Sequence, residues 1–263
     1  MGRVLAISSQ VARGHVGLAA TVPALQSLGH EVWALPTVVL ASRPGLGRAV
    51  KYPLPAPDLA AMLAALQADG CWAALDAVFA GYFPTPQAVV AAAQAIRRAK
   101  QTKAEIVVCV DPVLGDADRL YVAPETAVAL RDELLPLATL ATPNLFELAW
   151  LTGRAPGSLT DVPEAARRLR VNTVVVTSAG TTHDTISTIL VTADASSAWA
   201  TPRRAGIPNG AGDLFAGLLL GRILNGEPAV VALANGLSDL DRVLAASEHR
   251  SVLQLAPLLV RPC

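Results

Sequence analysis

The segment Gly210-Ala211-Gly212-Asp213 brings together residue types suited to the transfer of an anionic group. Glycines let backbone N–H groups approach a ligand with no side chain in the way. The apolar run from Asp213 to Leu224 predicts a buried helix, and the N–H groups at a helix N-terminus attract anions. Asp213 would lie beside such an anion and accept a proton from a hydroxyl. The alternative is that Asn209 or Asp213 only caps the helix.

Two carboxylates, Asp111 and Asp116, lie in the segment "DPVLGD" after an apolar run. Mg²⁺ favours a few carboxylates together with water and phosphate oxygens. The pair is therefore placed to reach a metal–phosphate unit. The alternative is an ordinary turn, because Asp, Pro and Gly all favour turns.

Two further segments carry polar groups at the ends of predicted strands. In "TPNLFE", from Thr142 to Glu147, Asn144 and Glu147 have the spacing of a capping box. A cap at the end of a strand can also face a ligand crevice, so the structural and functional readings are compatible. In "TSAG", Thr177 and Ser178 offer hydroxyls for a nucleotide phosphate or ribose, a weak signal by itself.

Several common site types are excluded by pattern. There is no G-x-x-x-x-G-K-[ST] segment, and Gly14 and Gly17 do not complete a dinucleotide fingerprint. The 4 histidines show no ligand spacing, which argues against catalytic zinc. The 3 cysteines are far apart, which argues against a disulfide framework and fits a reducing cytoplasm. A formal net charge of +0 argues against nucleic acid as a partner.

Short apolar runs alternate with helical patterns along the chain. Val- and Ile-rich runs between helices predict a parallel sheet covered by helices on both faces. Ligands in such sheets bind beyond the carboxyl ends of the strands. The predicted strands are 3–8, 30–39, 76–82 and 172–180, a strand that runs into a loop within 104–116, and a hairpin from 185–193 and 197–202. The predicted helices are 17–29, 57–70, 86–101, 124–138 and 144–153, followed by two long helical segments.

The length of 263 residues, with 52% hydrophobic residues, predicts one domain spanning 1–263. No apolar stretch reaches the roughly 18 residues that a membrane span needs. The first ten residues predict a strand and not a signal peptide. We therefore expect a cytoplasmic protein with no membrane partner.

Taken in order, these loops resemble the pyridoxal kinases of the ribokinase superfamily, the PfkB-like carbohydrate and vitamin kinases. The resemblance covers nearly the whole chain and rests on "ISSQVARGHVG", "AGYFPTPQ", "DPVLGD", "YVAPE", "TPNLFELAWLTG", "LVTAD" and the GAGD segment. It implies a ribokinase-like three-layer α/β/α sandwich with a mostly parallel central sheet. It also implies phosphorylation of the 5′-hydroxyl of pyridoxal by Mg-ATP in vitamin B6 salvage, with pyridoxine and pyridoxamine as further vitamers, a monovalent cation (K⁺ or Na⁺) and a homodimer.

The resemblance also implies roles for individual residues. Asp213 would be the general base, and Gly210, Ala211 and Gly212 would form the anion hole. Ser9 would hydrogen-bond the pyridine ring, which Val38 and Tyr82 would line. The residues implied on the Mg-ATP side are Asp111, Asp116, Thr142, Glu147, Thr177 and Ser178, with Asp116 and Glu147 attending Mg²⁺ through water or phosphate.

The chain departs from the family pattern at Ala41-Ser42-Arg43-Pro44, where the family usually has S-N-H-T or S-N-H-P. Its loop before Asn209 is also short, and the part after Ser238 matches loosely. The alternatives are a hydroxymethylpyrimidine or sugar kinase of the same superfamily, or a non-catalytic B6-binding protein. Hydroxymethylpyrimidine kinases usually begin with a D-x-S-G-G loop, where this chain has Ser8-Ser9-Gln10.

Overall fold

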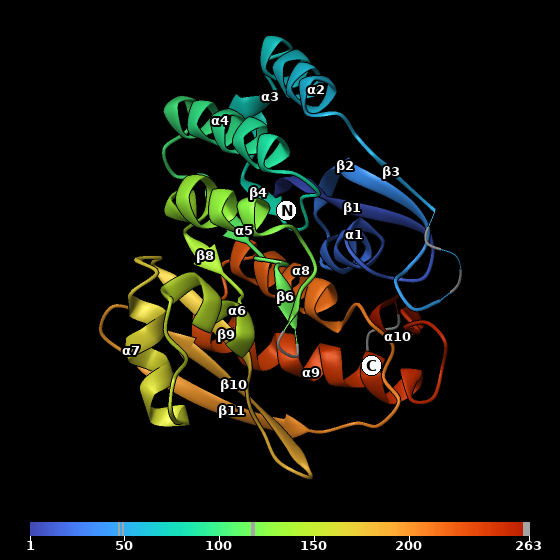
Figure 1. The fold of residues 1–263 in the computed structure, drawn as a ribbon, viewed down its shortest axis with the longest axis vertical. Helices are drawn as coiled ribbons and strands as arrows, with labels where there is room; N and C mark the ends of the chain where they lie inside the picture. Colours follow the sequence, from blue (N-terminus) through green and yellow to red (C-terminus); the bar gives the residue numbers. More distant parts are fainter. Residues whose placement is uncertain (47, 49, 117–118, 260–263) are drawn as a thin grey trace.

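The computed structural model describes residues 1–46, 48, 50–116 and 119–259 (Figure 1). Its centre is a nine-stranded sheet in the order β11-β10-β9-β8-β5-β4-β1-β2-β3. The six strands from β9 to β2 in this order are parallel to one another, and β3, β10 and β11 run antiparallel to their neighbours. The strands of this sheet are β1 Arg3–Arg13, β2 Glu31–Ser42, β3 Lys51–Pro53, β4 Ala77–Ala80, β5 Val107–Val110, β8 Leu140–Ala141, β9 Thr173–Thr181, β10 Thr185–Val191 and β11 Ser196–Pro202.

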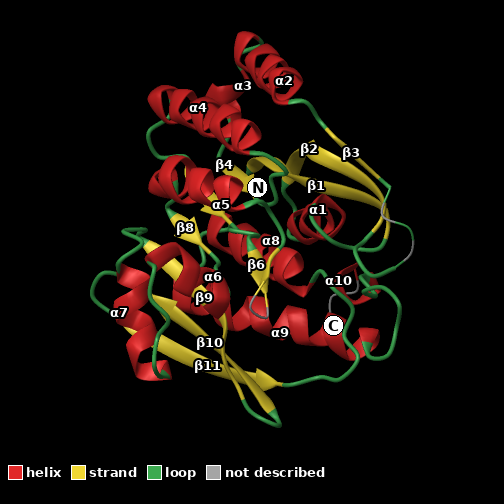
Figure 2. Ribbon diagram, in the orientation of Figure 1, coloured by secondary structure: helices red, strands yellow, loops and turns green. Residues whose placement is uncertain are grey.

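Helices connect and cover these strands, and a small hairpin of β6 and β7 lies outside the main sheet (Figure 2). Among the described residues, none of the helices combines the length and hydropathy that a bilayer-spanning segment requires. The elements are α1 Leu18–Ser27, α2 Ala56–Ala68, α3 Cys71–Ala74, α4 Pro86–Thr102, β6 Gly115–Asp116, β7 Arg119–Leu120, α5 Pro124–Ala129, α6 Leu145–Thr152, α7 Val162–Arg167, α8 Ala211–Leu224, α9 Ala229–Ser247 and α10 Ala256–Leu259.

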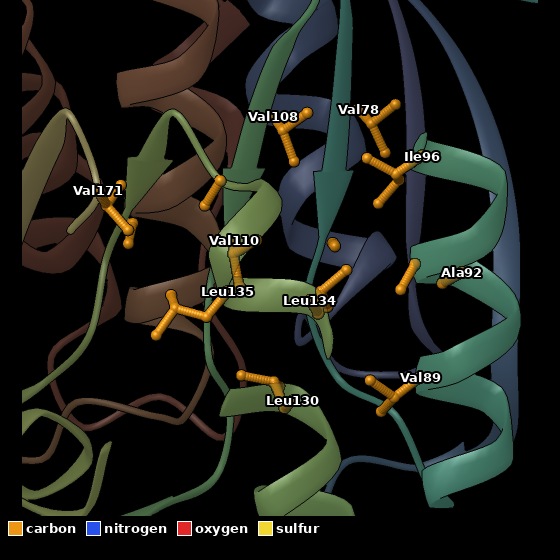
Figure 3. Close-up of a cluster of buried hydrophobic side chains, with 14 of the residues drawn as sticks. Val78, Val89, Ala92, Ile96, Val108, Val110, Leu130, Leu134, Leu135 and Val171 are labelled. Atoms are coloured by element: carbon orange, nitrogen blue, oxygen red, sulfur yellow. The ribbon is translucent and has the colours of Figure 1, made fainter. Parts of the chain in front are cut away.

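Side chains of the central strands alternate between two cores, one on each face of the sheet. In β1, Leu5 and Ile7 join the core under α2 and α4, whereas Val4 and Ala6 join the core under α1, α8 and α9. In Figure 3, Ile96 of α4 lies close to Val78 of β4 within the first of these cores. Both faces are buried because the residues at i and i+1 of a strand point to opposite sides. The predicted three-layer α/β/α arrangement with a mostly parallel sheet is confirmed.

The strand order reverses beside β1, which is where a ligand crevice is expected. The chain passes from β1 through α1 to β2 on one side, and then returns through α2 and α3 to β4 on the other side of β1. In open α/β sheets, ligands bind outside the carboxyl ends of the strands where the order reverses in this way. Ser9 of β1 and the Gly81-Tyr82 segment after β4 both lie at this point.

Several predicted elements differ from the structure. The strand predicted for 3–8 continues to Arg13, the one predicted for 30–39 continues to Ser42, and the one predicted within 104–116 spans only Val107–Val110. The predicted helix over 124–138 is α-helical only to Ala129; a π-helical turn over Leu130–Leu134 and a 3-10 turn over Leu135–Leu137 follow. Pro136 lacks the N–H that a continued α-helix needs. The strand predicted for 76–82 ends at Ala80, and the one predicted for 172–180 continues to Thr181 through a bulge.

Candidate active site

The N-terminus of α8 is capped by a glycine and not by a side chain. Gly210 is the N-cap residue with φ 113°, and the helix begins at Ala211, two residues earlier than the apolar run predicts. Asn209 is not the N-cap residue. The Asp213 carboxylate accepts its own backbone N–H in the first turn, so it satisfies one free amide there, in part as the capping alternative predicts. A Cβ on Gly210 would lie 1.7 Å from the His15 carbonyl oxygen, which makes glycine necessary there. The first turn of α8 therefore lies beside the loop after β1, and its N–H groups have no backbone acceptor four residues earlier in the helix.

Asp213 lies in the first turn of α8 and is held against that loop. The Gly17 backbone N–H donates to its carboxylate, and the Thr21 hydroxyl donates to its backbone carbonyl at 3.1 Å. Gly17 has φ 55°, and a Cβ on it would lie 2.2 Å from the Ser9 carbonyl oxygen and 2.3 Å from Ser9 Oγ. Only glycine fits this approach, so Ser9 and Asp213 come together on the two sides of Gly17.

The surroundings of the Asp213 carboxyl change its pKa. Burial raises its pKa from 3.8 to about 6, although the hydrogen bonds from Gly17 and from its own backbone N–H favour the charged form. The residue as a whole is still partly accessible to solvent. A carboxylate with a pKa near 6 is mostly ionised at neutral pH and is a better proton acceptor than an ordinary aspartate.

Asp111 follows β5 and faces the same crevice. It is 7% exposed, and it accepts a hydrogen bond of 2.8 Å from the Thr142 hydroxyl at the end of β8. Burial, and then the negative charge of Asp213, raise the pKa of Asp111 to about 7, against the effect of the Thr142 bond. Carboxylates far apart in the sequence therefore lie near enough for the charge of Asp213 to affect Asp111.

Glu147 closes the capping box predicted for α6. Its Oε2 accepts the Asn144 N–H at 2.9 Å, while Asn144 Oδ1 accepts the Glu147 N–H at 2.9 Å. Its Oε1 accepts the N–H groups of Leu114 at 3.0 Å and Gly115 at 3.4 Å. The structural reading of this motif is therefore confirmed, and the same carboxylate also fixes the loop that carries Asp116.

Glu147 differs from an ordinary capping residue because it is buried and its pKa is raised. Burial, followed by the charge of Asp111, raises its pKa well above the ordinary value, although the three backbone N–H groups favour the charged form. Both of its oxygens already accept main-chain hydrogen bonds. Asp116, in β6 beside Gly115, is exposed.

Thr177 and Ser178 lie at a bulge in β9. The pairing with β10 jumps from Val176–Ile189 to Gly180–Ser187, so three residues of β9 face one of β10. Ser178 is exposed and has φ 49°, an uncommon conformation for a non-glycine residue. The bulge turns this stretch out of the ladder, beside the bridge that pairs Thr177 with Asn144.

Ser9, Val38 and Tyr82 lie in neighbouring segments, on β1, on β2 and directly after β4. Ser9 and Val38 are paired across β1 and β2 and are 8% and 2% exposed. Tyr82 follows β4 and is partly buried, which raises the pKa of its phenol. The residues predicted from separate loops thus gather along one edge of the sheet and the start of α8.

Four residues near this edge were missed as site residues by the sequence analysis. Gly17 contacts Asp213, and Ser8 and Thr37 bond the backbone of Tyr82. Arg43, in the segment that departs from the family pattern, donates to the Ser251 carbonyl from Nη2 at 2.7 Å and from Nε at 3.2 Å. The sequence pointed to Arg43 only through the departure of its segment from the family pattern. The other contacts depend on tertiary structure and have no local signal in the sequence.

No protein-only metal cage is present in the described part of the chain, where no three His, Cys, Asp or Glu side chains are grouped to hold an ion. Burial, and then the charge of a neighbouring carboxylate, nevertheless raise the pKa values of Asp111 and Glu147. Such a set fits a cation that arrives bound to phosphate oxygens and keeps most of its water ligands.

Comparisons with known proteins agree with this geometry. A family model described as phosphomethylpyrimidine kinase matches residues 13–249. The pyridoxal kinase PdxY of Corynebacterium diphtheriae is 32% identical over 260 residues, which cover 95% of this chain and 92% of that protein. The chain belongs to the pyridoxal kinase family.

Other members of the pyridoxal kinase family extend the comparison. The pyridoxine/pyridoxal/pyridoxamine kinase of Bordetella bronchiseptica is 36% identical over 236 residues, covering 87% of this chain and 83% of that protein. The structure of the Leishmania donovani pyridoxal kinase with ADP and pyridoxamine superposes with a TM-score of 0.88 at 26% identity, covering 99% of this chain and 93% of that one. The family likeness therefore spans the whole sheet and the candidate active site.

Proposed function

We propose that this protein transfers the γ-phosphoryl group of ATP to the 5′-hydroxyl of pyridoxal and so forms pyridoxal 5′-phosphate for vitamin B6 salvage. The observation that carries the proposal is Asp213, a partly buried carboxylate of raised pKa beside a helix N-terminus that has no side-chain cap. Relatives more than 30% identical over most of the chain are pyridoxal kinases. The same family includes a kinase that acts on pyridoxine and pyridoxamine as well, so we extend the proposed substrates to these vitamers.

The proposed mechanism divides the site into a base and an anion hole. Asp213 accepts the proton of the substrate hydroxyl as its oxygen attacks the γ-phosphorus, and ADP leaves. The backbone N–H groups at Gly210, Ala211 and Gly212 face the charge on the transferred group. General-base help contributes about 10²–10⁴-fold. Positioning and electrostatic stabilisation supply the remainder of the acceleration.

Residues along the remaining strands are assigned to the two substrates. On the vitamin side, Ser9 hydrogen-bonds the pyridine ring, and Val38 and Tyr82 line its pocket. On the nucleotide side, carboxylates and hydroxyls surround the Mg-ATP phosphates and ribose. The residues proposed there are Asp111, Asp116, Thr142, Glu147, Thr177 and Ser178, with Asp116 and Glu147 attending Mg²⁺ through water or phosphate.

A second candidate is a hydroxymethylpyrimidine kinase, because the matching family model carries the related name phosphomethylpyrimidine kinase. Both reactions use the same phosphoryl-transfer site and differ in the ring that is bound. The start of the chain, Ser8-Ser9-Gln10, favours the pyridine substrate, and Ser9 and Val38 lie side by side in the structure where that ring would bind.

ADP release measured with pyridoxal, hydroxymethylpyrimidine and ribose in parallel tests the proposal. We expect the highest kcat/KM with pyridoxal. A higher value with hydroxymethylpyrimidine or ribose would reassign the substrate. Tight binding of pyridoxal with no ADP release from any of the three would instead identify a non-catalytic B6-binding protein.

Four further properties complete the proposal. We propose that residues 1–263 act as one kinase domain, that the protein works in the cytoplasm, and that it is a homodimer. Light scattering during gel filtration tests the dimer, since a mass near 27.2 kDa would identify a monomer. A monovalent cation, K⁺ or Na⁺, is proposed as an activator, and replacing it with a large organic cation in the ADP assay tests that role.

A further inference from the structure

The second strand contains a bulge directly beside the crevice. Ser8 of β1 is paired with Pro36 of β2, but the next residue, Ser9, is paired with Val38. Thr37 is therefore the extra residue. Pro36 provides no N–H group, which suits a place where the ladder of hydrogen bonds is interrupted.

The bulge directs the Thr37 side chain across β1 to the segment after β4. Its hydroxyl donates to the backbone carbonyl of Tyr82 at 2.8 Å. From the other side, Ser8 Oγ accepts the backbone N–H of Tyr82 at 3.0 Å. The backbone N–H of Tyr82 is thus bonded to a side chain of β1, and its backbone carbonyl to a side chain of β2.

The two hydroxyls are buried, and the segment that they hold fits closely. Ser8 and Thr37 are each 0% exposed. Gly81 makes the last ladder bond, donating to the Ile7 carbonyl at 2.9 Å. A Cβ on Gly81 would lie 2.5 Å from Ser8 Oγ, so the chain can approach Ser8 only with glycine at this position. Four separate features therefore hold the backbone of Gly81 and Tyr82: the bulge, the two buried hydroxyls and the glycine.

We infer that Ser8 and Thr37 are positioning residues that fix Tyr82 in the wall of the substrate pocket. This inference rests on the proposed function, because it takes Tyr82 as a residue that lines the ring site. Among the residues that the structure describes, no strand pairs with Tyr82 beyond the end of β4, so the two hydroxyls replace the sheet in setting the direction of its backbone. Neither residue is assigned to touch the substrate or nucleotide.

Steady-state kinetics of Thr37→Val test the inference. The valine keeps the shape of the side chain and removes the donor to the Tyr82 carbonyl. We expect the KM for pyridoxal to rise about tenfold, with kcat and the KM for ATP changing less than about threefold. The reason is that binding of the ring is weakened equally in the ground state and in the transition state. Ser8→Ala should shift the same KM in the same direction.

Thr139→Val is the matched control. The Thr139 hydroxyl also contacts main-chain groups of one residue, donating to the Val108 carbonyl at 3.3 Å and accepting the Val108 N–H at 3.0 Å. It lies at the amino end of β8, away from the crevice. This variant should lose stability without changing the KM for pyridoxal. An equal KM shift in both variants, or no shift in Thr37→Val, would overturn the inference.

A direct readout of Tyr82 separates this inference from the proposed function. The chain has 3 tyrosines, so ¹³Cζ-tyrosine labelling gives a simple NMR spectrum in which Tyr52 and Tyr121 are internal references. Thr37→Val should move the Tyr82 signal and leave the other two in place. An unmoved Tyr82 signal would refute the inference even in an active enzyme. If pyridoxal releases no ADP, the proposed function fails, and the NMR result alone decides the inference.

Discussion

Asp111→Asn should make the folded protein more stable at alkaline pH. The wild-type carboxyl is 7% exposed, and its pKa is raised from 3.8 to about 7 by burial and then by the charge of Asp213. At about 1.4 kcal/mol per pKa unit, ionising it costs the folded state about 4 kcal/mol. Asparagine keeps an oxygen to accept the Thr142 hydroxyl but adds an amide NH₂ whose burial costs about 1–2 kcal/mol. The net expected gain at pH 8 is about 2–3 kcal/mol.

The sign of the pH dependence follows from linkage. Between pH 4 and pH 7 the folded protein holds a proton on Asp111 that the unfolded chain has lost, so wild-type stability falls as the pH rises through this window. Asp111→Asn removes that dependence. Its advantage over the wild type should therefore be about 1 kcal/mol or less at pH 5, increase towards pH 7 and then stay constant.

Urea denaturation followed by circular dichroism at pH 5, 6, 7 and 8 measures this difference, and melting temperatures should differ by about 5–10 °C at pH 8. Asp132→Asn is the control, because Asp132 is exposed and paired with Arg131, whose hydrogen bonds and charge lower its pKa. That variant should change stability by less than about 0.5 kcal/mol. A pH-independent difference, or an Asp111→Asn protein that is less stable at pH 8, would refute the reasoning.

Two other predictions follow from the start of α8. Because Asp213 must be ionised to accept a proton and burial raises its pKa to about 6, kcat/KM should fall about tenfold per pH unit below pH 6; a profile that is flat to pH 5 would contradict the assignment. Gly210→Ala should cost more than about 2 kcal/mol in urea denaturation, because φ is 113° and the new Cβ would meet a carbonyl oxygen at 1.7 Å. Gly226→Ala, with φ 85° and no atom within 4 Å, should cost about 1 kcal/mol, and equal losses would argue against a tight contact at Gly210.

Local patterns were sufficient for most of the fold. Alternating apolar runs and helical segments predicted the sheet with helices on both faces, and the close pair of strands at β10 and β11 predicted the hairpin. The capping box of Asn144 and Glu147 was also readable, because its two bonds join residues three apart. These features are encoded within a few residues, so the sequence alone shows them.

Other elements had no local signal. The strand β8 has two residues, Leu140–Ala141, and is defined by pairing with β5 and β9. A strand of two residues has no periodicity to detect. The hairpin of β6 and β7 and the short helix α7 were missed for the same reason. The bulge at Thr37 is set by contact with Tyr82, which is 45 positions further along the chain.

The candidate site was predictable in composition but not in arrangement. The resemblance supplied Ser9, Asp111, Glu147 and Asp213 as separate motif residues. Their proximity depends on the order of the parallel strands and on Gly17, whose backbone links Ser9 to Asp213. The raised pKa values are a consequence of that proximity and of burial, so they could be derived only from the folded structure.

Asp213 is the residue on which the proposed reaction depends most. Asp213→Asn keeps the size of the side chain and removes the proton acceptor. Rapid-quench measurement of phosphoryl transfer to pyridoxal, at saturating ATP and pH 8, isolates the chemical step from product release. We predict a rate at least about a hundredfold below that of the wild type, with a melting temperature that is unchanged or raised. A variant that transfers phosphoryl at close to the wild-type rate would contradict the role of Asp213 as the general base.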